Sequence, residues 1–386
     1  MDENLRFKVK FLAYKNYYLV TRKEMGFYMR KVISYIFLVI LLCFCIPIIF
    51  TNKTETIGTV LLNTIDTPSN SENSSSPAGI ENVGQNELIT NEAVIENYNY
   101  DQYNTIKLLH KETNEIEEIN LDEYLCGVIS AEMPASYELE ALKSQAVVAR
   151  TYTLYKIINS KPHGEEASIC DSYQCCQAWI SKEKRFEKWA DGTENENWNK
   201  IVTAINETKG KVITYDGKII NAFFHANSGG KTEIPVNVWG GTNYPYLQVV
   251  ETSGEEGYTQ YSSQVELTID ELINKFKEKY NDIAINTENI SEEIKALEYT
   301  ESGRVKTLKI GNKNVAGTEV RSVLNLKSTN FDIELDLENS KIKFNVIGYG
   351  HGIGMSQTGA DAMAKQGSNY EQIIKHFYVG VEIVDM

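Results

Sequence analysis

Alternating apolar and polar positions predict β-strands in several parts of the chain. TIKLLHKETNEIEEINL (105–121) alternates on both sides of a polar turn, as expected for a β-hairpin. KVITYDGKIINAFFHA (211–226) has the pattern of a second hairpin, which turns at the Asp-Gly pair 216–217. VKTLKIGN (305–312) and FDIELDLENSKIKFNVIGYG (331–350) also alternate and predict further strands.

Apolar positions at helical spacing predict helices between these strands. We expect Asp122 to cap a first helix, which ends at Glu132 before a Met-Pro pair. Ser136 is the expected cap of a second helix over residues 137–158, which is apolar on more than half of its circumference and should lie in the core. QVELTIDELINKFKEKY and NYEQIIKHFY follow the helical period as well. Because helices and strands mix without a regular βαβ alternation, we expect an α+β fold with mixed sheets and packed helices.

A different pattern occupies the N-terminus. Residues 1–31 hold eight Lys or Arg against three acids, and residues 32–50 add nineteen positions without a charge. This length suits one transmembrane helix, and the basic flank predicts a cytoplasmic N-terminus. The residues after the span make a poor cleavage site, so we expect a signal anchor rather than a cleaved signal peptide. Residues 51–103 are rich in Asn, Ser, Thr and Glu and predict a flexible tether.

Composition and charge narrow the choice of partners. The chain is 42% hydrophobic and 24% charged, with 23 tyrosines and seven prolines, which is typical of a globular protein. Its net charge of −15 gives no basic field for phosphate groups, so no nucleic-acid partner is expected. We therefore expect residues 104–386 to form one folded domain outside the cytoplasm.

Glu132 is the first candidate for chemistry because it extends an apolar helix face. It lies three and four residues after Ile129 and Val128, where an apolar residue is expected. A carboxyl held against apolar groups has a raised pKa, because burial disfavours its charged form. A general acid that works near neutral pH needs this shift. The alternative is a solvated glutamate at a helix end.

A second candidate is a cluster of metal ligands in HGEEASICDSYQCCQAW. His163, Cys170, Cys175 and Cys176 lie within fourteen residues, and four such ligands suit tetrahedral zinc. In an oxidising compartment, a disulfide between Cys170 and one of the adjacent cysteines is the second interpretation. A catalytic cysteine is the third. Spacing alone does not decide among these three.

Two polar loops are weaker candidates. In AFFHANSGGKT a strand ends in a turn that carries His225 and Ser228, but no G-x-S-x-G elbow in the chain supports a Ser-His hydrolase. GYGHGIGMSQTGADAMAKQG carries His351 in a glycine-rich loop before a helix that Ser356 can cap. This loop lacks the G-K-[ST] of a nucleotide site. The functional interpretation of both loops is a polar floor for a ligand rich in hydroxyl groups.

Five motifs follow one another along the folded part of the chain. They are S-A-E-M-P, A-L-K-S-Q-A-V-V-A-R-T-Y, C-Q-A-W, F-H-A-N-S-G-G and G-Y-G-H-G-I-G-M-S-Q-T-G-A. In this order they resemble the stage II sporulation protein D family (the SpoIID/LytB domain), clostridial type, over about residues 105–386. The resemblance implies a membrane-anchored lytic transglycosylase that degrades peptidoglycan during engulfment. It places the protein in the mother-cell membrane, with its catalytic domain facing the intermembrane space around the forespore.

The resemblance also implies site residues. The catalytic glutamate of the family lies in A-E-M-P, hence Glu132. Some clostridial members hold zinc on two Cys and two His; His163, Cys170 and Cys176 match three of these ligands, and Cys175 stands where the other histidine is expected. A structural zinc with three Cys ligands and one His ligand is therefore implied. The residues expected to line a groove for sugar hydroxyls and acetamides are Gln145, Arg150, Gln177, His225, Ser228, His351, Ser356 and Gln357.

The implied substrate is glycan strands that the partner amidase, stage II sporulation protein P, has stripped of peptides. Stage II sporulation protein M completes the implied complex. Cleavage between N-acetylmuramic acid and N-acetylglucosamine to a 1,6-anhydro end needs only one carboxylic acid, because the muramic 6-hydroxyl is the nucleophile. The alternatives are a non-catalytic peptidoglycan-binding scaffold for a partner amidase and a zinc-dependent amidase.

Overall fold

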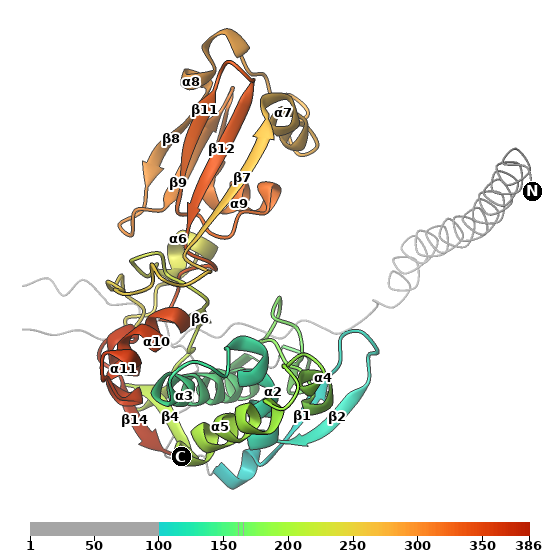
Figure 1. Cartoon of the computed structure of the whole chain (residues 1–386), viewed down its shortest axis with the longest axis vertical. Coiled ribbons are helices and arrows are strands. Elements are labelled where there is room, and N and C mark those ends of the chain that lie inside the picture. The colour runs from blue at the N-terminus through green and yellow to red at the C-terminus, as the bar shows by residue number, and fades with distance from the viewer. Residues whose placement is uncertain (1–99, 161, 165) are drawn as a thin grey trace, which may run out of the picture. The chain divides into compact units, whose positions relative to one another are not determined.

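A computed structural model describes residues 100–386 apart from residues 161 and 165. The predicted cytoplasmic segment, the predicted membrane span and nearly all of the predicted tether (1–99) lie outside the described residues. Among the described residues, no helix is both long and apolar enough to cross a membrane. Helices combine with several small sheets in Figure 1, which confirms the α+β class.

The described residues contain two hydrophobic cores. The first core takes its residues from the chain before residue 259 and again from residue 353 onward, and the second takes its residues from 265–346. The elements around the first core are η2 (Tyr100–Tyr103), β1 (Thr105–Leu109), β2 (Ile116–Asn120), α2 (Leu121–Glu132), α3 (Leu139–Tyr155), η3 (Lys156–Ser160), β3 (Ile169–Cys170), α4 (Lys182–Phe186), α5 (Glu194–Glu207), β4 (Lys211–Tyr215), β5 (Lys218–Ile219), β6 (Phe224–His225), α6 (Pro235–Trp239), β13 (Met355–Ser356), α10 (Gln357–Lys365), α11 (Tyr370–Phe377) and β14 (Glu382–Asp385). The elements around the second core are β7 (Ser262–Thr268), α7 (Ile269–Lys277), η4 (Thr287–Asn289), α8 (Ile290–Glu293), β8 (Ile294–Tyr299), β9 (Val305–Ile310), β10 (Lys313–Ala316), α9 (Gly317–Leu324), β11 (Phe331–Asp336) and β12 (Lys341–Ile347).

Helix α3 lies at the centre of the first core, as its apolar circumference predicted (Figure 1). Of its 17 residues 14 are buried, and it contacts α2, α5, α10, α11 and β4. Because α3 is covered on nearly all sides, most of its polar side chains face neighbouring protein groups. The chain continues after Tyr155 as a short π-helical segment, η3.

The two predicted caps of α2 and α3 are wrong. Asn120, rather than Asp122, caps α2, because its side-chain oxygen accepts hydrogen bonds from two N–H groups of the first turn. Ser136 does not cap α3, because the N-cap position is Glu138, and the Tyr137 N–H donates to the Pro134 carbonyl (3.0 Å) in a turn around Ser136. Both helices still begin within three residues of the predicted caps.

Strand pairing agrees with the predicted hairpins. β1 pairs with β2 in antiparallel register, and β3 joins β1 in parallel, which carries Cys170 to this sheet. β4 and β5 turn at Asp216 and Gly217, whose positive φ angles of 48° and 74° fit a type I′ turn. β14 pairs with the other edge of β4 and closes the C-terminus onto the first core.

The second core contains one wrong prediction. Residues 262–268 form strand β7 and not the start of a helix, because β7 pairs along its whole length with β12. Helix α7 begins only at Ile269, after a capping box formed by Thr268 and Glu271. The predicted strands β9, β11 and β12 are confirmed, in sheets of order β10-β9-β8 and β11-β12-β7. The predicted helix near the C-terminus, α11, is confirmed as well.

Candidate active site

Glu132 is the last residue of helix α2, as predicted. The next residue, Met133, is extended (φ −126°, ψ 142°) and precedes Pro134, which ends the helix. The predicted apolar face is present, because Val128 and Ile129 are fully buried. The helix therefore carries a half-buried carboxyl at its C-terminus, where it has no following turn to cover it.

The Glu132 carboxyl has two hydrogen-bond donors and no cationic partner among the described residues. Oε1 accepts from the Ala178 backbone N–H (2.8 Å), and Oε2 accepts from Nε2 of Gln357 (3.3 Å). Burial raises the pKa of the Glu132 carboxyl, and the two hydrogen bonds offset only part of this shift. The group therefore holds its proton at a pH where an ordinary glutamate has lost it.

Glu132 lines a pocket with a volume of about 710 Å³. Among the described residues that line this pocket, Glu132 is the one carboxylate. The lining also includes the exposed rings of Tyr173, Trp239 and Tyr349. An acid that has no second acid near it cannot act with a carboxylate base or nucleophile from the same pocket.

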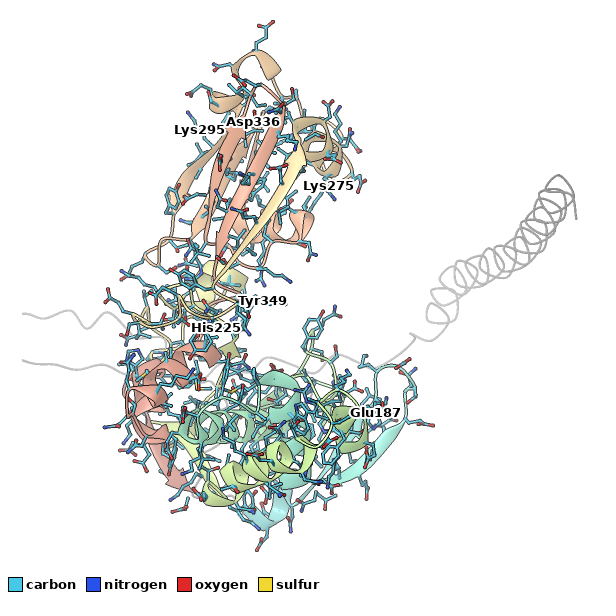
Figure 2. All side chains as sticks on the ribbon, viewed as in Figure 1. Glu187, His225, Lys275, Lys295, Asp336 and Tyr349 are labelled. Carbon is cyan, nitrogen blue, oxygen red and sulfur yellow. The ribbon has the colours of Figure 1, made fainter. Side chains whose placement is uncertain are left out.

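The pocket contains half of the predicted groove residues. Those that line it are Gln177, His225, His351 and Gln357. Gln357 is the first residue of α10, which Ser356 caps as predicted by accepting from the Gly359 N–H. His225 and Tyr349, both labelled in Figure 2, line this same pocket.

The other predicted groove residues are buried elsewhere, and their predicted location is corrected. They are Gln145, Arg150, Ser228 and Ser356. Gln145 and Arg150 lie within the buried helix α3, and Nη1 of Arg150 donates to the Thr208 carbonyl (2.8 Å), which fixes the end of α5. Ser228 and Ser356 are fully buried and bind neighbouring protein groups instead of facing the pocket.

His225 and Ser228 form a hydrogen-bonded pair, but the pair is not a nucleophile with its base. Nδ1 of His225 donates to the Ile353 carbonyl (3.1 Å), so Nε2 accepts from the Ser228 hydroxyl (2.9 Å). Burial and the nearby charge of Arg304 lower the pKa of His225 to about 3. Since Ser228 is fully buried, it cannot reach a substrate, and the geometry disfavours a Ser-His hydrolase.

Sequence reasoning missed Glu255, a fully buried acid that joins the two polar loops. Its carboxylate accepts from two backbone N–H groups, those of Ser228 (3.1 Å) and Gly230 (3.2 Å). It also accepts from the hydroxyls of Thr252, Ser356 and Thr358. Glu255 thereby fixes the start of α10, and with it the Gln357 amide that contacts Glu132. No local pattern marks this residue, because its partners lie up to about a hundred positions away.

Replacing Glu255 by Ala should lower the free energy of unfolding by roughly 3–5 kcal/mol, because several buried donors lose their acceptor together. Urea denaturation of the full chain measures this difference. The neighbouring Glu256 is exposed, and Glu256→Ala should change stability by no more than about 0.5 kcal/mol. Equal stabilities of the two variants would contradict the role given to Glu255.

Trp239 and Tyr349 are also functional candidates that sequence reasoning missed. Trp239 ends the short helix α6 and is 52% exposed, with its ring 4.9 Å from Phe223 and 5.2 Å from His351 between centroids. Tyr349 is 40% exposed and lies under the Lys327 ammonium (4.5 Å to the ring centroid). Large exposed rings that line a pocket and are held by neighbouring side chains suit stacking against the apolar faces of sugars.

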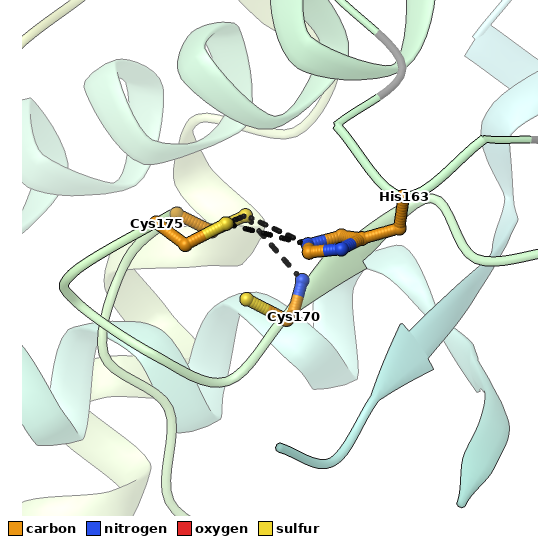
Figure 3. Close-up of side chains that lie close together, drawn as sticks. His163, Cys170 and Cys175 are labelled. Carbon is orange, nitrogen blue, oxygen red and sulfur yellow. Dashed lines mark hydrogen bonds between the residues drawn. The ribbon is translucent and has the colours of Figure 1, made fainter. Parts of the chain in front are cut away.

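The predicted Cys/His cluster is brought together in space (Figure 3). The four ligand atoms of His163, Cys170, Cys175 and Cys176 all lie within 4.8 Å of one another. Nε2 of His163 is 3.5 Å from each sulfur of the adjacent cysteines, and these two sulfurs are 3.6 Å apart.

These distances fit a tetrahedral metal site better than a disulfide. Zn–S bonds of about 2.3 Å and Zn–N bonds of about 2.0–2.1 Å set tetrahedral edges of about 3.8 Å for S···S and about 3.6 Å for S···N. A disulfide needs about 2.05 Å between sulfurs. The four cysteines among the described residues are all free. Two ligands, Cys175 and Cys176, also line the pocket, and the chain reaches Ala178, the donor to Glu132, two residues later.

Comparison with known proteins finds similarity to sporulation proteins. A family model described as stage II sporulation protein matches residues 109–215, and a model described as a domain of unknown function (DUF8618) matches residues 251–354. The chain is 32% identical over 280 residues to stage II sporulation protein D of Bacillus amyloliquefaciens, which covers 72% of this chain and 78% of that protein.

Two proteins of Bacillus subtilis (strain 168) are also similar. Stage II sporulation protein D is 33% identical over 269 residues, or 69% of this chain and 75% of that protein. A protein named amidase enhancer is 30% identical over 306 residues, or 67% of this chain and 40% of that protein. By the extent of these matches, the chain belongs to the stage II sporulation protein D family.

Proposed function

We propose that the protein is a lytic transglycosylase that cleaves peptide-stripped peptidoglycan strands between N-acetylmuramic acid and N-acetylglucosamine. The observation that carries this proposal is the single carboxyl of the pocket, Glu132, with its raised pKa. Hydrolases of glycosidic bonds use a pair of carboxylates. A lytic transglycosylase needs one, because its nucleophile belongs to the substrate.

The proposed reaction uses Glu132 twice. The protonated carboxyl gives its proton to the glycosidic oxygen, the C1–O bond breaks, and the oxygen leaves as the 4-hydroxyl of N-acetylglucosamine. The resulting carboxylate then takes the proton of the muramic 6-hydroxyl, whose oxygen bonds to C1 and closes the 1,6-anhydro ring. Glu132 ends protonated, so no external acid or base is consumed.

The contacts of Glu132 support this cycle. The Ala178 N–H and the Gln357 amide stabilise the carboxylate that forms after the first proton transfer. Tyr173, Trp239 and Tyr349 provide exposed rings for the sugar faces, and His351 adds a neutral ring beside Trp239. His351 stays neutral because burial lowers its pKa well below the usual range, so it acts in binding and not as the acid.

A zinc ion fits the cluster described above, and His163, Cys170, Cys175 and Cys176 would hold it. The ion would be structural there, because four protein ligands would leave no position for water or substrate. The protein's own contribution is the short connection from Cys176 through Gln177 to Ala178. Nε2 of Gln177 donates to the hydroxyls of Tyr124 (3.1 Å) and Thr153 (2.8 Å), so this segment is fixed on both sides.

The same proposal includes the cellular setting. A membrane-anchored protein with its catalytic domain in the intermembrane space would meet glycan strands during engulfment. Amidase action must come first if stripped strands are the substrate, and the likeness to a protein named amidase enhancer supports a partnership with an amidase. Stage II sporulation proteins P and M are the proposed partners.

The test is product analysis of the full chain with peptide-free glycan strands. Mass spectrometry should find 1,6-anhydromuramic ends with the wild type, and Glu132→Gln should form them about 10³-fold more slowly. The alternative function is a non-catalytic scaffold that holds glycan in the same pocket for an amidase. If the wild type binds the strands but cuts none, with and without an added amidase, the protein is a scaffold and the proposed enzymatic function is contradicted.

The pH dependence follows from the raised pKa of Glu132. Because the first step needs the protonated carboxyl, activity should persist above pH 4.5 and fall as the pH rises through the raised pKa. Initial rates of anhydro-product formation between pH 4 and pH 9 measure the profile. A rate that rises steadily over this range would indicate a general base and contradict the assignment.

A further inference from the structure

Arg321 is a cation that the proposed mechanism leaves without a task, although it lines the same pocket as Glu132. It lies on helix α9, and Nε donates to the Leu326 carbonyl (3.3 Å). In the part of the chain that the structure describes, its guanidinium forms no ion pair, and its two terminal nitrogens have no hydrogen-bond partner. A guanidinium has five N–H donors, so a largely desolvated one usually meets acceptors.

The other two arginines of this region show the contrast. Arg150 and Arg304 are almost fully buried, and both direct their terminal nitrogens at backbone carbonyls. They hold the fold together. Arg321 is half-buried, and its free donors belong to a residue of the pocket lining.

The position of Arg321 is fixed from two directions. Helix α9 ends at Leu324 and is capped by Asn325, whose left-handed backbone (φ 52°) lets the Leu326 N–H return to the Arg321 carbonyl (2.9 Å). The next residue, Lys327, accepts from the Gly350 N–H (2.9 Å) and covers the ring of Tyr349. Arg321 is thereby placed on the side of the pocket that Tyr349 and His351 form.

The charge of Arg321 is not used by the catalytic acid. Among the described residues, the Glu132 carboxyl accepts hydrogen bonds from Ala178 and Gln357 and forms no ion pair with Arg321. The chain has a net charge of −15, yet the pocket holds one carboxyl against two cations, Arg321 and Lys156. A locally cationic pocket in an acidic protein favours an anionic group on the ligand.

We propose that Arg321 binds the lactyl carboxylate that muramic acid exposes after its peptide has been removed, and so selects peptide-free strands. This inference rests on the proposed function. In an intact strand the lactyl carboxyl is an amide, which has no charge and one oxygen. The free carboxylate offers two charged oxygens, which match the planar fork of a guanidinium. The lactyl group is on C3 of the sugar ring whose C1 is the reacting atom, so one pocket can hold both.

The test asks whether the negative charge of the lactyl carboxylate, rather than the presence of a peptide, governs binding. Glycan strands with free lactyl carboxylates are compared with the same strands after conversion of these carboxyls to neutral methylamides. Binding of both is measured to the full chain carrying Glu132→Gln, in which cutting is about 10³-fold slower. We expect the free strands to bind about tenfold more tightly or better, which is the scale of one charge-assisted pair.

Three further substitutions in the Glu132→Gln protein test whether Arg321 is the residue that recognises the lactyl carboxylate. Arg321→Gln should reduce the tenfold preference to about one, and Arg321→Lys should keep the fold and retain only part of the preference, because a lysine lacks the planar fork. Lys343→Gln removes an equal charge from the exposed face of β12 and should keep the full preference. Equal binding of the two strands by the parent, or an undiminished preference in Arg321→Gln, would overturn the inference.

Failure of the proposed function looks different. If the wild type makes no anhydro ends from free strands while the binding preference depends on Arg321, the carboxylate site is supported and the proposed transglycosylase reaction is contradicted. If the wild type cuts free and amidated strands with the same kcat/KM and binds them equally, the transglycosylase reaction is supported and the proposed role of Arg321 is contradicted.

Discussion

Glu132→Gln is expected to lower kcat on peptide-free glycan strands by about 10³-fold, the scale of losing one general acid. The amide cannot give a proton to the glycosidic oxygen, and it cannot take one from the muramic 6-hydroxyl. The substitution keeps the shape of the side chain, and its carbonyl oxygen can still accept from the Ala178 N–H. Initial rates of anhydro-product formation measure the effect.

Stability distinguishes loss of the acid from loss of the fold. The folded protein raises the pKa of Glu132, so it binds this proton more tightly than the unfolded chain does. The stability that this tighter proton binding adds to the folded state is present at low pH and is lost as the pH rises through the raised pKa of Glu132. Glu132→Gln should therefore be at least as stable as the wild type at pH 8, by thermal denaturation. Glu118→Gln, an exposed acid on β2, is the matched control and should keep full activity; an active Glu132→Gln would refute the assignment.

Cys170→Ala is the second change with a large expected effect, through the proposed zinc. Loss of one ligand should reduce zinc affinity by about 100-fold or more, so the purified variant should contain well under one zinc per chain. Activity should fall at least about tenfold, because the segment from Cys176 to Ala178 loses the attachment that zinc provides at Cys176 and the Ala178 N–H shifts away from Glu132. Metal analysis and the product assay measure the two effects.

Cys126→Ala is the control for this experiment. Cys126 is also a buried, free cysteine, but it lies in helix α2 outside the cluster. It should keep one zinc per chain and nearly full activity. Equal zinc content in both variants would contradict the metal site, and a wild type that contains no zinc and lacks two thiols by titration would establish the disulfide instead.

Local patterns predicted the parts of the site that depend on short segments. The register of Val128, Ile129 and Glu132 follows from one helix, and the Met-Pro pair ends it, so both the burial and the raised pKa of Glu132 could be predicted. The four ligands of the cluster lie within fourteen residues, and a tight loop was enough to bring them together.

Contacts between distant segments could not be predicted in this way. Gln145 and Arg150 were expected in the groove, but α3 is covered on nearly all sides, so their polar groups face protein and not ligand. Glu255 and Arg321 were missed for the converse reason. Each stands in a segment without a recognisable motif, and only the fold brings it to the loop around His351 or to the pocket of Glu132.

The pairing of β7 with β12 shows the same effect in the fold. Residues 262–268 have an apolar period that also fits a helix, and the partner strand some 80 positions later decides in favour of β structure. The Asp-Gly turn at residues 216–217 was predictable because its conformation depends on those two residues alone.

The most direct test of the central claim is digestion of peptide-free glycan strands by the full chain in water enriched in ¹⁸O. If Glu132 is the single acid and the muramic 6-hydroxyl is the nucleophile, every new end is a 1,6-anhydro ring and carries no ¹⁸O. New reducing ends that carry ¹⁸O would show that water is the nucleophile. That result would contradict the account and require a second catalytic carboxylate.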